Sequence, residues 1–206
     1  MEATLLSKVE SANKIIQESL SKYSISLAFN GGKDCSVLLH LLSLQTSANI
    51  PTLNVAEQVP FIEVQEFIEY ASSRYNITVK TYTNTMKNSL QEFIKNTDLN
   101  CILMGTRSTD PYSHHLNFFS ETDGDYPKIM RCHPLLDWSF CDIWAYIRYH
   151  GIPYCCLYDM GYTSLGGRLN TFPCEELRNE ERVCLYEPAF KLIDESKERV
   201  GRVKRS

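Results

Sequence analysis

A glycine-rich segment at residues 30–35, NGGKDC, contains residue types that can hold a polyphosphate. Gly31 and Gly32 allow backbone conformations that other residues resist, so that successive N–H groups can point at one anion while the following helix adds its N-terminal dipole. Lys33 would place a positive charge on phosphate oxygens, and Asp34 would either cap the helix or hold Mg²⁺. The alternative is a glycine turn with exposed charges.

Two other phosphate-binding motifs do not describe this segment. A Walker loop has Ser or Thr directly after its lysine, whereas Asp34 follows Lys33 here. A dinucleotide fingerprint needs the spacing GxGxxG, which the segment lacks. The segment is therefore a candidate phosphate loop of another type.

The elements around the loop predict a strand, a tight turn and a helix, because residues 24–29 alternate and residues 37–42 are an apolar run. The same rhythm predicts further strands at residues 52–56, 77–82 and 101–104 and helices at residues 61–75 and 85–96. Strands alternating with helices indicate an α/β, Rossmann-like fold with a mostly parallel sheet and helices on both faces. Ligands bind beyond the carboxyl ends of such strands, here residues 29–31, 56–57 and 105–107.

The flanking segments are less regular. An amphipathic helix is expected at residues 7–23, with Ser7 and Glu10 as a capping box. The polar stretch at residues 108–128 is long enough to be functional or disordered. The composition of the charge-rich tail from Glu175 predicts a solvated helix or a frayed end.

A second helix start follows the polar stretch. Ser139 and Asp142 form a capping box, and Gly151 marks the helix end. Trp138 and Trp144 are interpreted as core anchors.

Composition limits the partners and the compartment. With 21 Lys+Arg against 25 Asp+Glu the net charge is -4, which argues against a nucleic-acid partner. No signal peptide and no membrane span is recognised, so a cytoplasmic protein with no membrane contact and no obligate protein partner is expected. The eight cysteines are interpreted as reduced, buried thiols; an iron–sulfur site at Cys155 and Cys156 is the less favoured alternative.

The loop with its helix, FNGGKDCSVLLHLL, resembles the pyrophosphate-binding loop of the PAPS reductase and ATP-pyrophosphatase-like superfamily, whose common form is SGGKDS. Asn30 and Cys35 replace the two serines, and this variant resembles the eukaryotic FAD synthetase (FMN adenylyltransferase) family. Four more blocks, at residues 105–113, 122–147, 157–167 and 188–202, are similar to motifs of that family in the same order.

The resemblance implies a nucleotidyltransferase that moves AMP from MgATP to the phosphate of FMN, with FAD and pyrophosphate as products. It implies a single domain over residues 1–206, with a nucleotide-binding core at residues 1–107. Residues 108–206 would supply flavin-binding loops and a C-terminal helical or loop extension. ATP and FMN are the implied small-molecule partners, FAD is the flavin product, and Mg²⁺ accompanies ATP.

The site residues follow from the loop, from fold analogy and from the matching blocks. Catalytic roles fall to Asn30, Lys33, Asp34 and Asp110. The ATP contacts are Phe29, Asn30, Gly31, Gly32, Lys33, Asp34, Cys35, Ala56, Glu57, Gly105 and Arg107. The FMN contacts that the resemblance implies are Asp110, Asp123, Tyr126, Arg199 and Arg202. The metal ligands that it implies are Asp34 and Asp110.

For several of these residues an ordinary structural interpretation competes. Asp110 would start an Asp-Pro turn, and Arg107 would be a surface charge. Arg199 and Arg202 would share one face of a helix if the tail is helical, or form a solvated basic tail. His114 and His115 are interpreted as exposed loop residues.

Two other activities and a binding role also compete. A phosphoadenylyl-sulfate reductase-like enzyme would need a C-terminal nucleophilic cysteine, and none lies beyond Cys184. A non-catalytic ATP- or flavin-binding module is disfavoured by the presence of Lys33, Asp34 and Asp110. An enzyme that adenylates a carbonyl group or a tRNA base would need an added acceptor domain.

Overall fold

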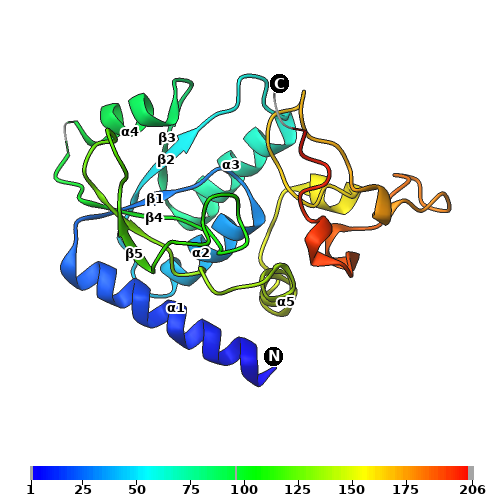
Figure 1. Ribbon diagram of the computed structural model, residues 1–206, viewed down its shortest axis with the longest axis horizontal. Helices are drawn as coiled ribbons and strands as arrows, with labels where there is room; N and C mark the ends of the chain where they lie inside the picture. The colour runs from blue at the N-terminus through cyan, green and yellow to red at the C-terminus, as the bar shows by residue number, and fades with distance from the viewer. Residues whose placement is uncertain (1, 96, 204–206) are drawn as a thin grey trace.

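The protein is described by a computed structural model that covers residues 2–95 and 97–203. Its centre is a six-stranded sheet with the order β3-β2-β1-β4-β6-β5 (Figure 1). All neighbouring pairs are parallel except β5 with β6. The strands are β1 (Ile25–Ala28), β2 (Pro51–Val55), β3 (Thr78–Tyr82), β4 (Cys101–Leu103), β5 (Phe119–Glu121) and β6 (Met130–Cys132). The prediction of a mostly parallel α/β sheet is confirmed.

Helices cover the sheet unequally. The helices are α1 (Ala3–Lys22), α2 (Lys33–Ser43), α3 (Ile62–Tyr75), α4 (Met86–Ile94) and α5 (Phe140–His150). Because side chains alternate along a strand, Cys101 and Leu103 enter the large core with α1, α2, α3 and α5. Ile102 points the other way, into a small core with α4. One sheet face is therefore thickly covered and the other carries mainly α4.

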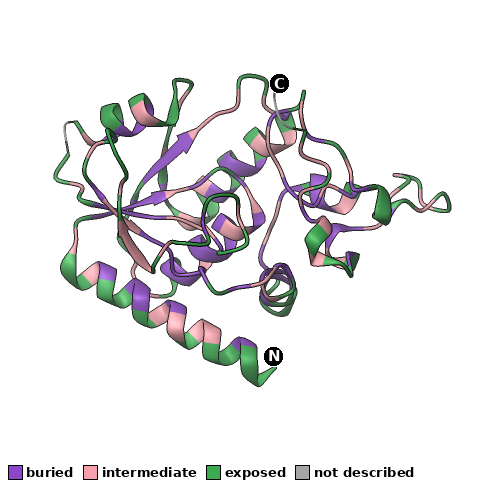
Figure 2. Ribbon diagram, viewed as in Figure 1, coloured by how far each residue is buried: buried purple, intermediate pink, exposed green. Residues whose placement is uncertain are grey.

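The burial of the residues differs between the elements. Figure 2 shows the central strands β1, β2 and β4 and helix α2 mostly buried, whereas α1 exposes its outer side. Trp138 and Trp144 are 1% and 3% exposed, so both lie in the core as predicted. Within the described residues, no helix combines the length and the apolar character needed to cross a bilayer.

The predicted elements between residues 24 and 104 agree with the structure to within a few residues at their ends, and the capping box of Ser139 and Asp142 is present. The capping box at Ser7 is wrong. α1 already begins at Ala3, because Leu5 is buried against the core and extends the helix upstream. Asn96, the last residue of one predicted helix, lies outside the described residues.

The chain beyond residue 107 holds more structure than predicted. The polar stretch contains β5, and β6 follows it, so the sheet continues past the expected core; the division at residue 107 stays a prediction. The tail is neither a solvated helix nor a frayed end up to residue 203. It forms the short 3₁₀ turns η2 (Glu175–Leu177), η3 (Ala189–Lys191) and η4 (Glu195–Lys197), which follow η1 (Cys156–Met160). Buried Ala189 and Leu192 attach it to the core.

Candidate active site

The candidate phosphate loop joins β1 to α2. Gly31 has φ +75, a conformation that favours glycine, and Gly32 is the N-cap of α2. The Gly32 N–H donates to Asn30 Oδ1 at 3.0 Å, and the Lys33 N–H donates to the Tyr158 hydroxyl at 2.9 Å. Two of the loop N–H groups are therefore engaged within the protein, which leaves the N-terminal dipole of α2 and its other first-turn N–H groups for an anion.

Gly105 lets the end of β4 approach this loop. A Cβ at Gly105 would lie 2.8 Å from Cys35 N and 2.9 Å from the carbonyl carbon of Asp34, well inside contact distance. The residue follows β4, which pairs with β1. Glycine is needed here because the backbone at the start of α2 occupies the side-chain position.

Four charged residues form a buried cluster below the loop. Lys33 Nζ lies 3.0 Å from Asp34 Oδ2 and 2.5 Å from Glu198 Oε1. Arg107 Nε lies 2.8 Å from Asp34 Oδ1, and Arg107 Nη2 lies 2.6 Å from Glu198 Oε1. The surface interpretation of Arg107 is wrong, because its side chain is 1% exposed. Arg107 therefore contacts Asp34 and Glu198 from the interior of the protein.

The cluster sets the ionisation of its carboxylates. Burial favours a higher pKa for Asp34, but the charges of Lys33 and Arg107 outweigh burial and hold the pKa below its ordinary value. Burial raises the pKa of Asp110, and the nearby Asp34 charge acts in the same direction. The two carboxylates therefore face the same site with different proton affinities.

Asp34 and Asp110 fit the chemistry of a Mg²⁺ site. Asp34 Oδ1 is buried and, within the described part of the chain, accepts no hydrogen bond, although Arg107 Nε is close. Asp110 Oδ2 accepts the Arg107 N–H at 2.9 Å, as an Asp-Pro turn would have it, while Oδ1 is directed to Arg199 at 3.8 Å. Mg²⁺ commonly takes one or two carboxylates and completes its shell with water and phosphate. The two side chains can hold it only together with a phosphate ligand.

A cleft of about 730 Å³ lies at the carboxyl ends of the parallel strands. It brings together most of the residues predicted from sequence: Phe29, Asn30, Gly32, Lys33, Asp34, Cys35, Glu57, Gly105, Asp110, Asp123, Tyr126, Arg199 and Arg202. Gly31 instead faces Val64 and Ile68 of α3. The cleft is continuous from the phosphate loop to the loop that carries Asp123.

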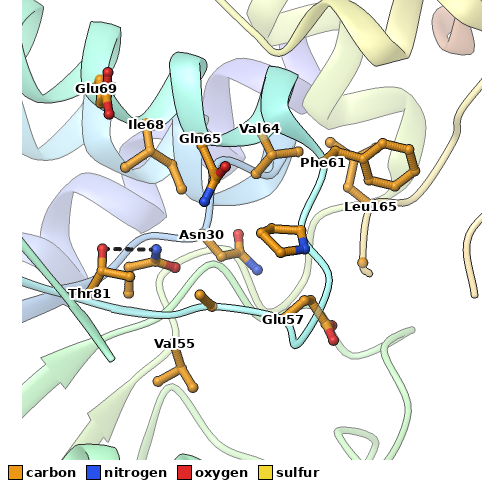
Figure 3. Close-up of a pocket in the computed structure, with 14 residues that line it drawn as sticks. Asn30, Val55, Glu57, Phe61, Val64, Gln65, Ile68, Glu69, Thr81 and Leu165 are labelled. Carbon is orange, nitrogen blue, oxygen red and sulfur yellow. Dashed lines mark hydrogen bonds between the residues drawn. The ribbon is translucent and has the colours of Figure 1, made fainter. Parts of the chain in front are cut away.

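A smaller pocket of about 190 Å³ adjoins the loop and contains Ala56 and Glu57. Figure 3 shows Val64 and Ile68 of α3 pointing into it from one side, with Val55 and Glu57 on the opposite side and Asn30 between them. Its walls combine apolar side chains with the polar end of β2. A flat polar ring could be held here next to the phosphate loop.

The far end of the cleft has an apolar floor. Met86 and Leu90 of α4 face Ile102 and Met104, and these residues line the cleft with Tyr126. The floor exists because α4 covers its sheet face only in part. The sequence predicted a helix and a strand here but not that their side chains would together line a cleft.

Asp123 has a partner that was not predicted. Asp123 Oδ2 lies 3.0 Å from Arg131 Nη1, and Arg131 Nη2 donates to the Glu121 carbonyl at 2.6 Å. Arg131 comes from β6, a strand that sequence reasoning missed. The expected carboxylate is thus part of an ion pair at the apolar end of the cleft.

The two tail arginines meet at a turn rather than on a helix. Arg199 and Arg202 each place Nη1 3.5 Å from Ser164 Oγ, and Arg202 also donates to the Leu165 carbonyl. A Cβ at Gly166 would collide with the Arg202 guanidinium, so this glycine makes room for it. The two side chains lie close together although the condition of a helical tail is not met, because residues 199–202 form a turn after η4.

The remaining candidates lie apart from the cleft or differ in exposure. His114 and His115 are exposed, as predicted. Cys155 is buried. Cys141 and Cys156 are exposed at the starts of α5 and η1, and Cys184 is half-buried, so the expectation of buried thiols fails for these three. Within the described residues, no group of three or more His, Cys, Asp or Glu side chains is arranged to hold a metal ion by itself.

Comparisons with known proteins bear on the same residues. Residues 24–173 match the phosphoadenosine phosphosulfate reductase domain family. The probable FAD synthase of Schizosaccharomyces pombe is 36% identical over 197 residues, which cover 90% of this chain and 74% of that protein. The chain belongs to the FAD synthase family. The probable FAD synthase of Caenorhabditis elegans is 39% identical over 96% of the chain, which spans only 40% of that protein.

The chain is also similar in three-dimensional structure to a solved adenylyltransferase. The crystal structure of Candida glabrata FMN adenylyltransferase is 27% identical, with a TM-score of 0.89 over 99% of this chain and 89% of that one. Structures of the same protein contain FMN with an ATP analogue, and FAD with pyrophosphate. The fold of this FAD synthase family member is therefore that of a known adenylyltransferase.

Proposed function

We propose that this chain transfers AMP from MgATP to the terminal phosphate of FMN, giving FAD and pyrophosphate. The observation that carries the proposal is the continuous cleft, which places the phosphate loop at one end of a path whose other components are Asp110, the arginine pair and an apolar floor. A phosphate donor and a phosphate-bearing aromatic acceptor would need these surfaces in this order. The relatives named FAD synthase support the same reaction.

The ligands would divide the cleft between them. The adenine would occupy the small pocket near Ala56 and Glu57, with the triphosphate over the start of α2. The FMN phosphate would lie between Arg199 and Arg202, whose guanidinium groups converge on Ser164. The flavin ring would lie on the apolar floor, with the Tyr126 ring available to stack on it.

The reaction would then be an in-line displacement. An oxygen of the FMN phosphate attacks the α-phosphorus of ATP, the bond to the β-phosphate oxygen breaks, and pyrophosphate leaves. Such transfers need little covalent help, so positioning and charge stabilisation dominate. When bound at Asp34 and Asp110, Mg²⁺ would neutralise charge on the phosphates.

The reaction is tested with FMN, MgATP and an added pyrophosphatase, followed by chromatographic separation of the flavins. FAD is the expected product. Replacing Asp34 with Ala should keep the fold and remove turnover, since the carboxylate faces the cleft. If ATP binds but no FAD forms, the chain is a binding module; wild-type turnover in D34A would assign Asp34 to helix capping alone.

A further inference from the structure

Glu198 is a buried carboxylate that joins the C-terminal segment to the phosphate loop. Its Oε1 lies 2.5 Å from Lys33 Nζ, and both of its oxygens lie 2.6 Å from Arg107 Nη2. The side chains of Lys33 and Arg107 are 2% and 1% exposed, so water cannot solvate them. Glu198 supplies the interior negative charge that these two cations require.

The same two cations contact Asp34 on the cleft side. Lys33 and Arg107 each bridge Asp34 to Glu198, at the distances given above. The Asp34 side chain is 21% exposed and Glu198 is 9% exposed, so Asp34 is the cleft end of the bridge and Glu198 the interior end. The four charges cancel, and the cations are held between two carboxylates.

Glu198 also precedes Arg199, one of the two arginines proposed to bind the FMN phosphate. Its backbone carbonyl accepts the Thr163 hydroxyl at 2.7 Å, which fixes the segment to the turn that carries Ser164. The next residue, Arg199, places Nη1 3.5 Å from Ser164 Oγ and 3.8 Å from Asp110 Oδ1. Of two consecutive residues, Glu198 therefore contacts the loop cations and Arg199 contacts Ser164 and Asp110.

We propose that Glu198 is a positioning residue for adenylyl transfer, which restrains Lys33 and Arg107 beneath Asp34 while it seats Arg199 beside Asp110. In this role it keeps the donor and acceptor phosphates in register and lowers the net positive charge that the loop presents to pyrophosphate. Its catalytic part rests on the proposed function. Its effect on pyrophosphate binding rests on the charge arrangement alone.

The test is Glu198→Gln, which keeps the shape of the side chain and removes its charge. The loop cluster then gains one positive charge, so inorganic pyrophosphate should bind about tenfold tighter by calorimetry. FAD formation should slow by about tenfold or more, because a shift of the reacting groups is costly. A merely structural loss would have the opposite sign and weaken pyrophosphate binding.

A matched control exists in the same segment. Glu195 Oε2 accepts the Phe140 N–H at 2.9 Å, so Glu195→Gln removes a carboxylate that attaches the tail to α5 without touching the loop cations. Pyrophosphate affinity and kcat should stay within about threefold of wild type. An equal effect in both variants would mean that tail attachment, not the Glu198 charge, is responsible, and would overturn the proposal.

Other outcomes also decide the question. Unchanged or weaker pyrophosphate binding by folded E198Q overturns the proposal. If E198Q does not fold, the test is Glu198→Asp, which keeps the negative charge but shortens the side chain by one methylene. The kcat of E198D should fall about tenfold while its affinity for pyrophosphate stays unchanged. A wild-type kcat in E198D would overturn the proposal. If the wild-type chain makes no FAD, the proposed function fails, while the pyrophosphate comparison still tests the charge restraint by Glu198.

Discussion

Replacing Gly105 with Ala should separate the geometry of the phosphate loop from the stability of the fold. The new Cβ would lie 2.8 Å from Cys35 N, whereas ordinary contacts begin near 3.4 Å, so the start of α2 must move by about 0.6 Å. Overpacking of this kind costs about 1–3 kcal/mol. A displacement of about 1 Å at reacting groups can cost about 100-fold in rate, so kcat/KM for FAD formation should fall by about tenfold to 100-fold.

Gly151→Ala is the matched control for this change. Gly151 ends α5 with φ +60, and no atom lies within 4 Å of an added Cβ. The left-handed conformation costs Ala about 1 kcal/mol, which lowers Tm by about 3 °C in a chain of this size. Its kcat/KM should equal that of wild type.

The pair is measured by thermal unfolding and by steady-state FAD formation. G105A should lose activity out of proportion to its change in Tm, and G151A should lose only stability. Wild-type kcat/KM in folded G105A would refute the reasoning, because it would show that the contact between β4 and α2 does not position the reacting groups. Equal losses of activity in both variants would attribute the effect to general destabilisation.

Three further predictions concern charge. Arg202→Ala should raise KM for FMN by about tenfold to 100-fold, since a charge-assisted hydrogen bond to phosphate is lost. Binding of riboflavin, which has no phosphate, should stay unchanged. Equal effects on both flavins would contradict the assignment of Arg202 to the phosphate. If the charge of Asp110 organises the phosphates, Asp110→Asn should lower kcat about 100-fold with the fold intact. Turnover and circular dichroism measure the two effects. An unchanged kcat would assign Asp110 to the turn alone. Burial lowers the pKa of His133 to about 4, so the unfolded chain binds the proton first as pH falls. Stability should therefore drop by about 3 kcal/mol between pH 6.5 and 4 in urea titrations, and His133→Gln should flatten that drop; an equally steep drop in the variant would contradict it.

The strand, turn and helix of the candidate phosphate loop could be predicted because the sequence signals for them are local. Gly31, Gly32 and Asp34 occupy fixed places between one strand and one helix, and the strand order places their turn at the sheet edge where ligands bind. Arg199 and Arg202 were different. Only the resemblance singled them out, because their residue types alone also describe a solvated tail.

Residues that depend on distant contacts could not be predicted. Lys33 and Glu198 are 165 positions apart, and a glutamate in a charge-rich tail has no local signal of burial. Arg107 has none either, since its partners come from α2 and the tail. β5 and β6 were missed because each has three residues and includes polar side chains, whereas the equally short β4 is an apolar run.

The arrangement of charges gives the two ends of the cleft different roles. At the loop, Asp34 and Glu198 neutralise Lys33 and Arg107, so these side chains have little charge left for a triphosphate. A nucleotide bound there must bring its own countercharge, which is why we propose MgATP rather than free ATP as the donor. At the acceptor end, burial and the charge of Arg199 lower the pKa of Arg202 despite the nearby Glu57. A phosphate dianion would relieve that repulsion. Under the proposed function the arginine pair would therefore select the acceptor by its phosphate, while the loop would depend on Mg²⁺ bound with the donor.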